Sequence, residues 1–230
     1  MRMTRLKMFG LSKMQMIRLS ERNDWMIKVE NIDFWGFKHA IRGMRNPMNS
    51  WDKSDSYFRG EESWSVGKND LDLMRRLYKA GTEHRKYLRQ ISVSMDITAP
   101  LYWWKEFDTY KVGTVANSCS TMHKIHSKKF TVSDFSCEQM TEDVTCEAFR
   151  NTIKALNFNR DMFLETKDKK WWWNMIQSLP SSYNQRRTVT MNYENVVTII
   201  KQRSGHKLDE WNQFVETLKG LPYVSEIMEN

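Results

Sequence analysis

Residues 91–120, "ISVSMDITAPLYWWKEFDTYKVGTVANSCS", contain the strongest fold signal in the sequence. Apolar side chains alternate with Ser and Asp at its start, and the apolar set is Ile91, Val93, Met95 and Ile97. A period of two predicts a strand with one buried face. Pro100 is suited to begin a helix. The aromatic run behind it therefore predicts a helix packed into a core or a subunit interface.

A polar tail follows the aromatic run directly. It carries Lys105, Glu106, Asp108, Thr109, Tyr110, Lys111, Thr114, Asn117, Ser118 and Ser120. Phosphate groups are bound by a cation together with several N–H or O–H donors, and a pyrimidine ring favours polar pairing beside an aromatic wall. A polar turn that leaves the core has the same composition. Both interpretations stay open on composition alone.

The rest of the chain adds one strand and several helices. Residues 25–34 predict a first strand, and residues 34–44 a short helix. Residues 46–68 are polar and predict a long loop. Further helices are expected from an Asn69 cap to Gly81, and over 138–165, 168–178, 195–203 and 207–220. The sum predicts an α+β fold, with a central antiparallel or mixed sheet and flanking helices.

Composition indicates a globular protein. The chain has 230 residues, of which 40% are hydrophobic and 28% charged. It lacks an apolar run of the roughly 20 residues that a membrane span needs, and it lacks a secretory leader pattern. Its three cysteines, Cys119, Cys137 and Cys146, fit neither a zinc pattern nor a disulfide framework. We therefore expect a reduced, cytoplasmic protein with no metal site.

The positive charge is concentrated at one end. Residues 1–22 have a charge of +5 out of the total of +8. We interpret residues 1–25 as a basic N-terminal extension and residues 26–230 as a single domain. Because no basic stripe is evident in the remainder, nucleic-acid binding is not favoured.

Two further basic clusters have open interpretations. Arg186, Arg187, Arg203 and Lys207 could hold an anion, or they could lie on a solvated helix face behind an N-cap at Asn192. The run "HRKYLRQ" from His84 could touch a phosphate, or it could be a surface junction. No Gly-rich phosphate loop, nucleophile triad or paired-carboxylate signature is present.

The order of these patches resembles the flavin-dependent thymidylate synthases. That family has the signature R-Q-x-x-R-H-R-x-x-S-x-N-x-x-S-x-R-Y, followed by L-P, an Asn at a helix start and an Arg at its end. Here Lys105 and Glu106 fall on the Arg-Gln pair, Thr109–Lys111 on Arg-His-Arg, and Thr114 on the first Ser. Asn192 and Arg203 match outright. The resemblance covers roughly residues 70–215 and rests on order and spacing more than on identical letters.

The resemblance implies reductive methylation of dUMP or a related pyrimidine deoxynucleotide, with FAD, NADPH and methylene-tetrahydrofolate, in a homotetramer. On the flavin side it implies His84, Thr109, Tyr110, Lys111 and Asn192. On the nucleotide side it implies Glu106, Lys111, Thr114, Asn117, Ser118, Ser120 and Arg203. Two cationic positions of the Arg-His-Arg slot are missing. Two alternatives therefore remain: an enzyme that modifies another pyrimidine nucleotide, and a non-catalytic nucleotide-binding protein on the same scaffold.

Overall fold

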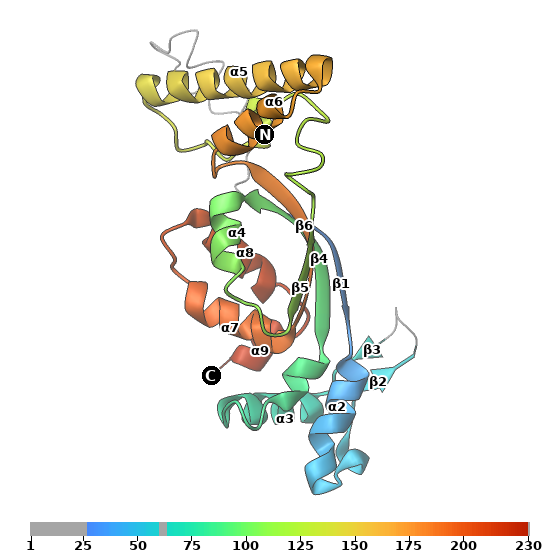
Figure 1. Cartoon of the computed structure of the whole chain (residues 1–230). Coiled ribbons are helices and arrows are strands. Elements are labelled where there is room, and N and C mark those ends of the chain that lie inside the picture. The colour runs from blue at the N-terminus through green and yellow to red at the C-terminus, as the bar shows by residue number, and fades with distance from the viewer. Residues whose placement is uncertain (1–26, 60–63, 230) are drawn as a thin grey trace, which may run out of the picture. The chain divides into compact units, whose positions relative to one another are not determined.

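The computed structural model describes residues 27–59 and 64–229, and these fall into two compact units. The sheet unit consists of residues 27–119 and 185–229, and the helical unit of residues 120–184 (Figure 1). The basic extension expected over residues 1–25 lies outside the described residues. The single domain expected over residues 26–230 stays a prediction.

The sheet unit contains a four-stranded sheet in the order β1-β4-β6-β5. Its strands are β1 (Lys28–Trp35), β4 (Ser92–Pro100), β5 (Thr114–Ser118) and β6 (Asn184–Asn192). β1 pairs antiparallel with β4, Lys28 opposite Thr98, and β5 pairs antiparallel with β6. The expected α+β fold with an antiparallel sheet and flanking helices is confirmed.

One face of the sheet is covered by helices. Val93, Met95, Ile97 and Ala99 of β4 are fully buried on this face, as the alternation predicted. α4 (Leu101–Phe107), α7 (Tyr193–Arg203), α8 (Asp209–Lys219) and α9 (Val224–Met228) lie on the same side of the sheet in Figure 1. The alternating apolar residues of β4 therefore define the face of the sheet on which the hydrophobic core is built.

The other face of the sheet is polar. Asp96 accepts hydrogen bonds there from Thr188 Oγ1 at 2.5 Å, Arg186 Nη2 at 2.7 Å and Asn31 Nδ2 at 2.7 Å. The bond from Thr188 is the largest cause of the lowered pKa of the Asp96 carboxyl, followed by those from Arg186 and Asn31. This carboxylate joins β4, β6 and β1.

Residues 46–68, expected to be a loop, contain short ordered elements. These are η1 (Asn46–Met48), η2 (Trp51–Lys53) and the β2 (Tyr57–Phe58) and β3 (Trp64–Ser65) hairpin. The segment lies between α2 (Phe37–Arg45) and α3 (Lys68–Lys79), and η3 (Lys86–Gln90) precedes β4. The helices expected near 34–44 and 69–81 are thus present.

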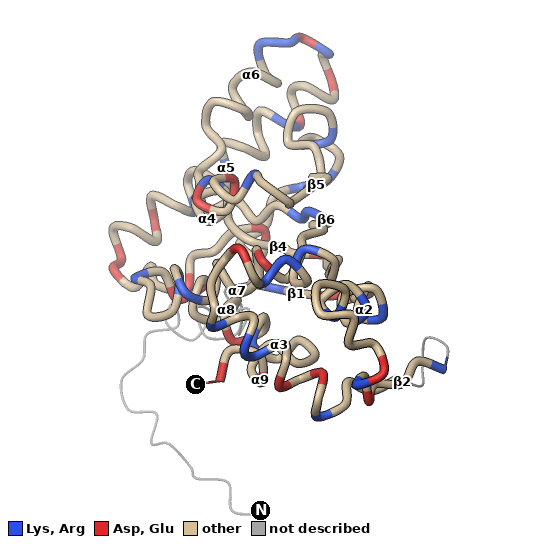
Figure 2. The backbone as a smooth tube through the Cα atoms, turned by 90° about the horizontal axis from the view of Figure 1, so that it is seen from below, with Lys and Arg blue, Asp and Glu red and all other residues tan. Residues whose placement is uncertain are grey.

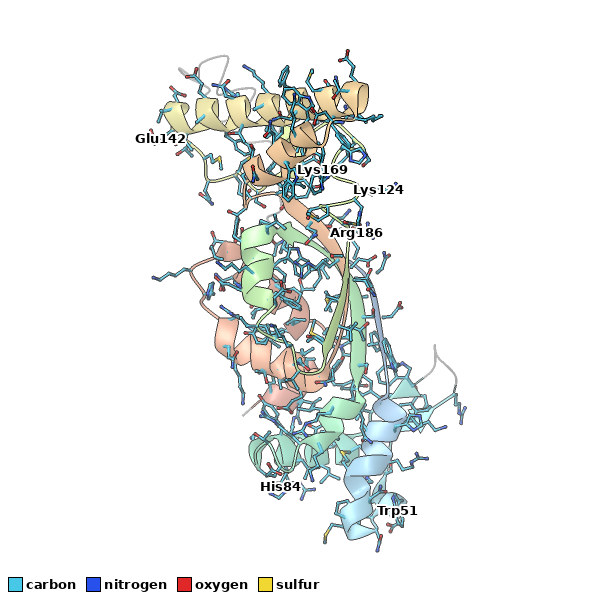
Figure 3. The ribbon with its side chains drawn as sticks, in the orientation of Figure 1. Trp51, His84, Lys124, Glu142, Lys169 and Arg186 are labelled. Atoms are coloured by element: carbon cyan, nitrogen blue, oxygen red, sulfur yellow. The ribbon has the colours of Figure 1, made fainter. Side chains whose placement is uncertain are left out.

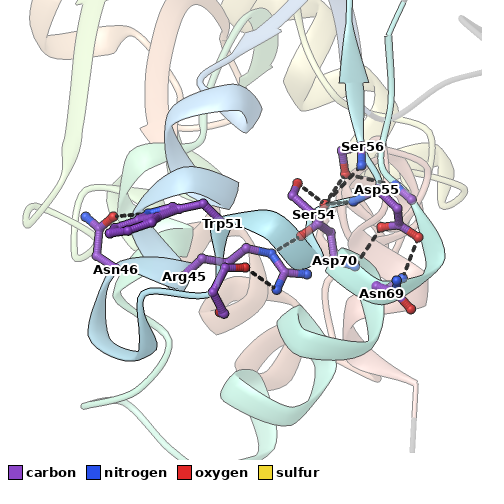
Figure 4. A network of polar contacts seen from close by, with 10 residues as sticks. Arg45, Asn46, Trp51, Ser54, Asp55, Ser56, Asn69 and Asp70 are labelled. Carbon is purple, nitrogen blue, oxygen red and sulfur yellow. Dashed lines mark hydrogen bonds and ion pairs between the residues drawn. The ribbon is translucent and has the colours of Figure 1, made fainter.

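The Asn69 cap was wrong. α3 begins at Lys68 with Gly67 as its N-cap residue, so Asn69 lies inside the first turn. The side chain of Asp55 instead accepts from the backbone N–H groups of Asn69 and Asp70 (Figure 4). The cap comes from fourteen residues upstream, which no local pattern could reveal.

The helical unit is built on α5 (Asp143–Thr166) and α6 (Lys169–Ser178), close to the ranges expected. Leu156 and Met175 are fully buried between them. Trp172 packs against this cluster and donates its indole N–H to the Met122 carbonyl. Trp173 remains 43% exposed.

Charges of both signs are interspersed along the described backbone (Figure 2). Within the described ranges, no helix is both long and apolar enough to cross a membrane.

Candidate functional site

The segment from Glu106 to Thr114 lies along helix α7. Tyr110 donates its hydroxyl proton to Gln202 Oε1 in the last turn of the helix, at 3.0 Å. Asn195, in the first turn, donates its side-chain N–H to the carbonyl of Val112 at 2.7 Å. The structure therefore brings together the two segments singled out from the sequence.

Arg203 is the centre of a cluster at the C-terminal end of α7. Its Nη1 lies 2.6 Å from Glu106 Oε2, and its Nε donates to the Tyr110 hydroxyl at 2.9 Å. Its guanidinium carbon lies 4.5 Å from the ring centroid of Trp211. His206 Nε2 lies 3.5 Å from the same carboxylate oxygen of Glu106. Three expected site residues, Glu106, Tyr110 and Arg203, thus form one contact network.

Tyr110 was expected on the flavin side of the site. The ring is partly buried, with Phe107 and Trp211 at centroid distances of 6.1 Å each. Its hydroxyl is engaged by Gln202 and Arg203. In this structure, Tyr110 therefore serves to hold the polar segment against the core.

Asn192 and Gly113 meet at the other end of α7. Asn192 Oδ1 accepts from the backbone N–H of Asn195 at 3.0 Å, so Asn192 is the N-cap of the helix, one of the two interpretations left open. Gly113 has φ +78°, and a Cβ placed on it would lie 2.6 Å from Asn192 Nδ2 and 2.7 Å from Asn195 Oδ1. The turn needs glycine for both its conformation and its close packing.

Gly113→Ala is expected to destabilise the protein by about 1–3 kcal/mol, because a left-handed backbone and a steric conflict coincide. Thermal unfolding of the full chain measures this. Gly81→Ala is the matched control: Gly81 has φ +106°, but nothing lies within 4 Å of a Cβ there. An equal loss in both variants would show that backbone strain alone operates and that the contact with the α7 cap contributes nothing.

His84 lies in the turn after α3, where it is exposed and labelled in Figure 3. The next residue, Arg85, makes a bidentate contact with Glu194 in the first turn of α7, with Nη2 to Oε1 at 2.6 Å. Arg85 is therefore occupied by a structural ion pair. His84 is the residue directly before Arg85, and this ion pair therefore fixes its backbone near the first turn of α7.

The remaining expected residues line or adjoin the edge strand β5. Thr109, Lys111, Asn117 and Ser118 are exposed, and the hydroxyl of Thr114 donates to the Tyr110 carbonyl. Asn117 stands opposite Thr188 of β6, and Ser118 opposite Arg187. Ser120 belongs to the helical unit, where its hydroxyl accepts from the backbone N–H groups of Met122 and His123.

Arg186 and Arg187 do not join Arg203. They are successive residues of β6, so their side chains leave opposite faces of the sheet. Arg186 contacts Asp96, whereas Arg187 contacts Asp108 at 2.7 Å and lies over the Trp104 ring at 4.2 Å. The structure does not form the three-arginine anion cluster considered from the sequence.

Sequence reasoning missed four residues that shape the site. They are Asn195, Gln202, His206 and Trp211. The signal for His206 is its position three residues beyond Arg203, just past the helix end. Among the described residues, no group of three or more His, Cys, Asp or Glu is arranged to hold a metal ion.

Solved structures match the fold of this chain along most of its length. No protein-family model and no curated protein matches the sequence. Thymidylate synthase X (ThyX) from Helicobacter pylori with FAD and dUMP matches with a TM-score of 0.62 and 17% identity, over 87% of this chain and 95% of that one. A second H. pylori ThyX complex with FAD and dUMP gives 0.65 and 15%, over 89% and 98%.

The chain has the ThyX fold. A third structure, the UMP/dUMP methylase PolB from Streptomyces cacaoi bound with 5-Br dUMP, matches with a TM-score of 0.59 and 14% identity, over 87% of this chain and 93% of that one. The resemblance drawn from motif order is confirmed at the level of the fold. At these identities, the ThyX fold is what the comparisons establish.

Proposed function

We propose that this protein is a flavin-dependent pyrimidine-nucleotide methyltransferase that carries out reductive methylation of dUMP or a related deoxynucleotide. The observation that carries this proposal is the contact of the Glu106–Thr114 segment with α7, on a chain with the ThyX fold. The matched H. pylori structures contain FAD and dUMP, and the S. cacaoi protein is a UMP/dUMP methylase.

The exposed donors suit the anionic parts of FAD. Lys111 offers an ammonium group and Thr109 a hydroxyl, and both are exposed. The Thr109 hydroxyl donates to the Glu106 carbonyl at 2.7 Å and would exchange that partner for the phosphate. Lys111 directly precedes Val112, which contacts the first turn of α7, and His84 directly precedes Arg85, which contacts the same turn. Both residues therefore flank a helix N-terminus, where backbone N–H groups and the helix dipole favour a phosphate.

Bound FAD would supply the hydride that the pyrimidine receives, with NADPH as reductant and methylene-tetrahydrofolate as carbon donor. The chain's own residues would bind and orient. Lys111, Thr109 and His84 would hold anionic groups, and Asn192 and Gly113 would keep the turn in place. On the edge strand, Thr114 and Ser118 lie on one face and Asn117 on the other. Ser118 would present its hydroxyl and Thr114 its hydroxyl oxygen to the nucleotide, and Asn117 would present its amide from the opposite face. Arg203 completes the set proposed within the sheet unit.

The proposal includes a cytoplasmic homotetramer. An exposed edge strand that carries expected ligand residues is consistent with a site completed by a second subunit. Sedimentation analysis of the full chain tests this, and a monomer with full nucleotide affinity would contradict it.

A second candidate is a non-catalytic nucleotide-binding protein on the same scaffold. The observation that favours it is the Thr109–Lys111 segment. The family signature has Arg-His-Arg at these three positions, and only Lys111 keeps a positive charge here. An enzyme acting on a different pyrimidine nucleotide is the third candidate, on the same observation.

Purification with FAD tests the proposal. Retained yellow colour with a flavin absorption band, bleached by NADPH and, with oxygen excluded, reoxidised only when dUMP and methylene-tetrahydrofolate are both added, supports it. Lys111→Gln should weaken flavin binding by about tenfold or more. Lys219→Gln, a surface lysine paired with Glu216 on α8, should leave it unchanged. Flavin uptake without turnover favours the second candidate, and no uptake at saturating FAD contradicts the first.

A further inference from the structure

The carboxylate of Glu106 occupies the position where an external anion would meet Arg203. Glu106 Oε2 accepts from Arg203 Nη1 at 2.6 Å and from the Trp211 indole N–H at 3.1 Å. His206 Nδ1 accepts from the Leu208 backbone N–H, and its Nε2 lies 3.5 Å from the same Glu106 oxygen and 3.1 Å from Arg203 Nη1. Three groups thus converge on one carboxylate oxygen.

The guanidinium of Arg203 is enclosed from its other sides. Its plane lies over the Trp211 ring, and its Nε is bonded to the Tyr110 hydroxyl, which in turn donates to Gln202. The Arg203 side chain is 18% exposed and the Glu106 side chain 35%, so the pair is partly buried. A charge–charge contact in such a place is screened less by water than one on the surface.

An external phosphate would have to displace a tethered carboxylate. Because Glu106 belongs to the same chain, its effective concentration at Arg203 is of millimolar order or above. A free anion therefore competes at a disadvantage. The Arg203 charge is balanced within the protein and is withheld from ligands.

We propose that Glu106 is a specificity-determining residue that blocks anion binding at Arg203, so that this end of the site receives an uncharged part of its ligand, such as a ring or a sugar hydroxyl. The inference deepens the proposed function and rests on it for the placement of the ligand. A phosphate or carboxylate group would then be held elsewhere, and a nucleotide would meet this cluster through its nucleoside part.

The test uses Glu106→Gln, which keeps an acceptor for the Trp211 indole and removes the charge that balances Arg203. Affinities of the full chain for inorganic phosphate, dUMP and deoxyuridine are measured by calorimetry. We expect inorganic phosphate and dUMP to bind about tenfold more tightly or better than to the unaltered protein, and deoxyuridine, which has no phosphate, to show no gain of that size. Glu106→Ala also removes the carboxylate that pairs with Arg203, and it is measured in case the Glu106→Gln variant does not fold.

Two controls test whether the gain is specific to Arg203, and is neither a general effect of added positive charge nor an effect of releasing any arginine. Asp108→Asn changes the net charge equally, just past the end of the same helix, and it releases Arg187 instead. The double variant Glu106→Gln/Arg203→Gln should lose the whole gain. An equal gain in Asp108→Asn, or a gain that survives loss of Arg203, would overturn the inference.

Unchanged phosphate and dUMP affinity in both Glu106 variants would also overturn it. That result differs from failure of the proposed function, in which the unaltered protein takes up neither flavin nor pyrimidine nucleotide. Phosphate binding is measured without flavin, so the two conclusions are reached independently.

Discussion

Asp70→Ala is expected to lower the free energy of unfolding by about 3–5 kcal/mol, because it removes one partner of a buried ion pair. Asp70 is fully buried, and its carboxylate accepts from Arg45 Nε at 2.6 Å. The hydroxyls of Ser54 and Ser56 donate to its other oxygen at 2.7 and 2.6 Å (Figure 4). Loss of the carboxylate leaves the Arg45 charge buried and releases the segment before α3.

Urea unfolding at neutral pH measures the loss. Asp72→Ala is the matched control, because Asp72 lies on the same helix with its side chain 49% exposed beside Arg75. That variant should cost under about 1 kcal/mol. Equal losses in the two variants would contradict the central structural role given to Asp70.

The same carboxylate predicts a pH dependence. Burial opposes ionisation of Asp70 most strongly, but the hydrogen bonds from Ser56, Ser54 and Arg45 outweigh it and lower the pKa of Asp70 below its usual 3.8. The stabilisation is therefore fully present above that ordinary pKa and is lost as the pH falls towards the lower folded-state pKa. Asp70→Asn should flatten this acid limb of the stability curve.

Trp211→Ala is expected to have an effect of similar size, about 3–5 kcal/mol, through loss of buried aromatic contacts. Trp211 is fully buried, with its ring centroid 4.6 Å from Trp103 and 6.1 Å from Phe214. Its removal also deprives Arg203 of the surface on which it lies. The variant should therefore lose both thermal stability and nucleotide affinity.

Trp211→Phe separates most of the packing from the hydrogen bond. It keeps an aromatic ring in the core but removes the indole N–H that donates to Glu106, together with the second ring of the indole. We expect a smaller loss, about 1–2 kcal/mol, from the missing hydrogen bond and the smaller ring. A loss as large as that of the alanine variant would show that the hydrogen bond, and not the packing, dominates.

The elements that the sequence predicts well are those with a buried face of regular period. β4 is recognisable because Val93, Met95 and Ile97 all face the core. β5 escaped prediction because it is an edge strand of small, mostly exposed residues, and its partners in β6 lie 69 to 77 positions away in the sequence. β6 escaped because Arg186 and Arg187 interrupt its apolar alternation.

The candidate site was predictable in outline but not in its pairings. Motif order placed Glu106 and Arg203 near one another, because each stands at a fixed place in the resemblance. It could not show that the two side chains neutralise each other, since that depends on the crossing of α7 past the Glu106–Thr114 segment. Likewise, the Asp partners of Arg186 and Arg187 come from β4 and the end of α4.

Hydrogen exchange of the full chain with and without FAD and dUMP tests the central claim most directly, because it reports where a ligand acts on the backbone. If residues 105–120 and 192–206 together form the pyrimidine-nucleotide site, both ranges gain protection when FAD and dUMP are added. Protection confined to other parts of the chain, or no protection at saturating ligand, would contradict the account.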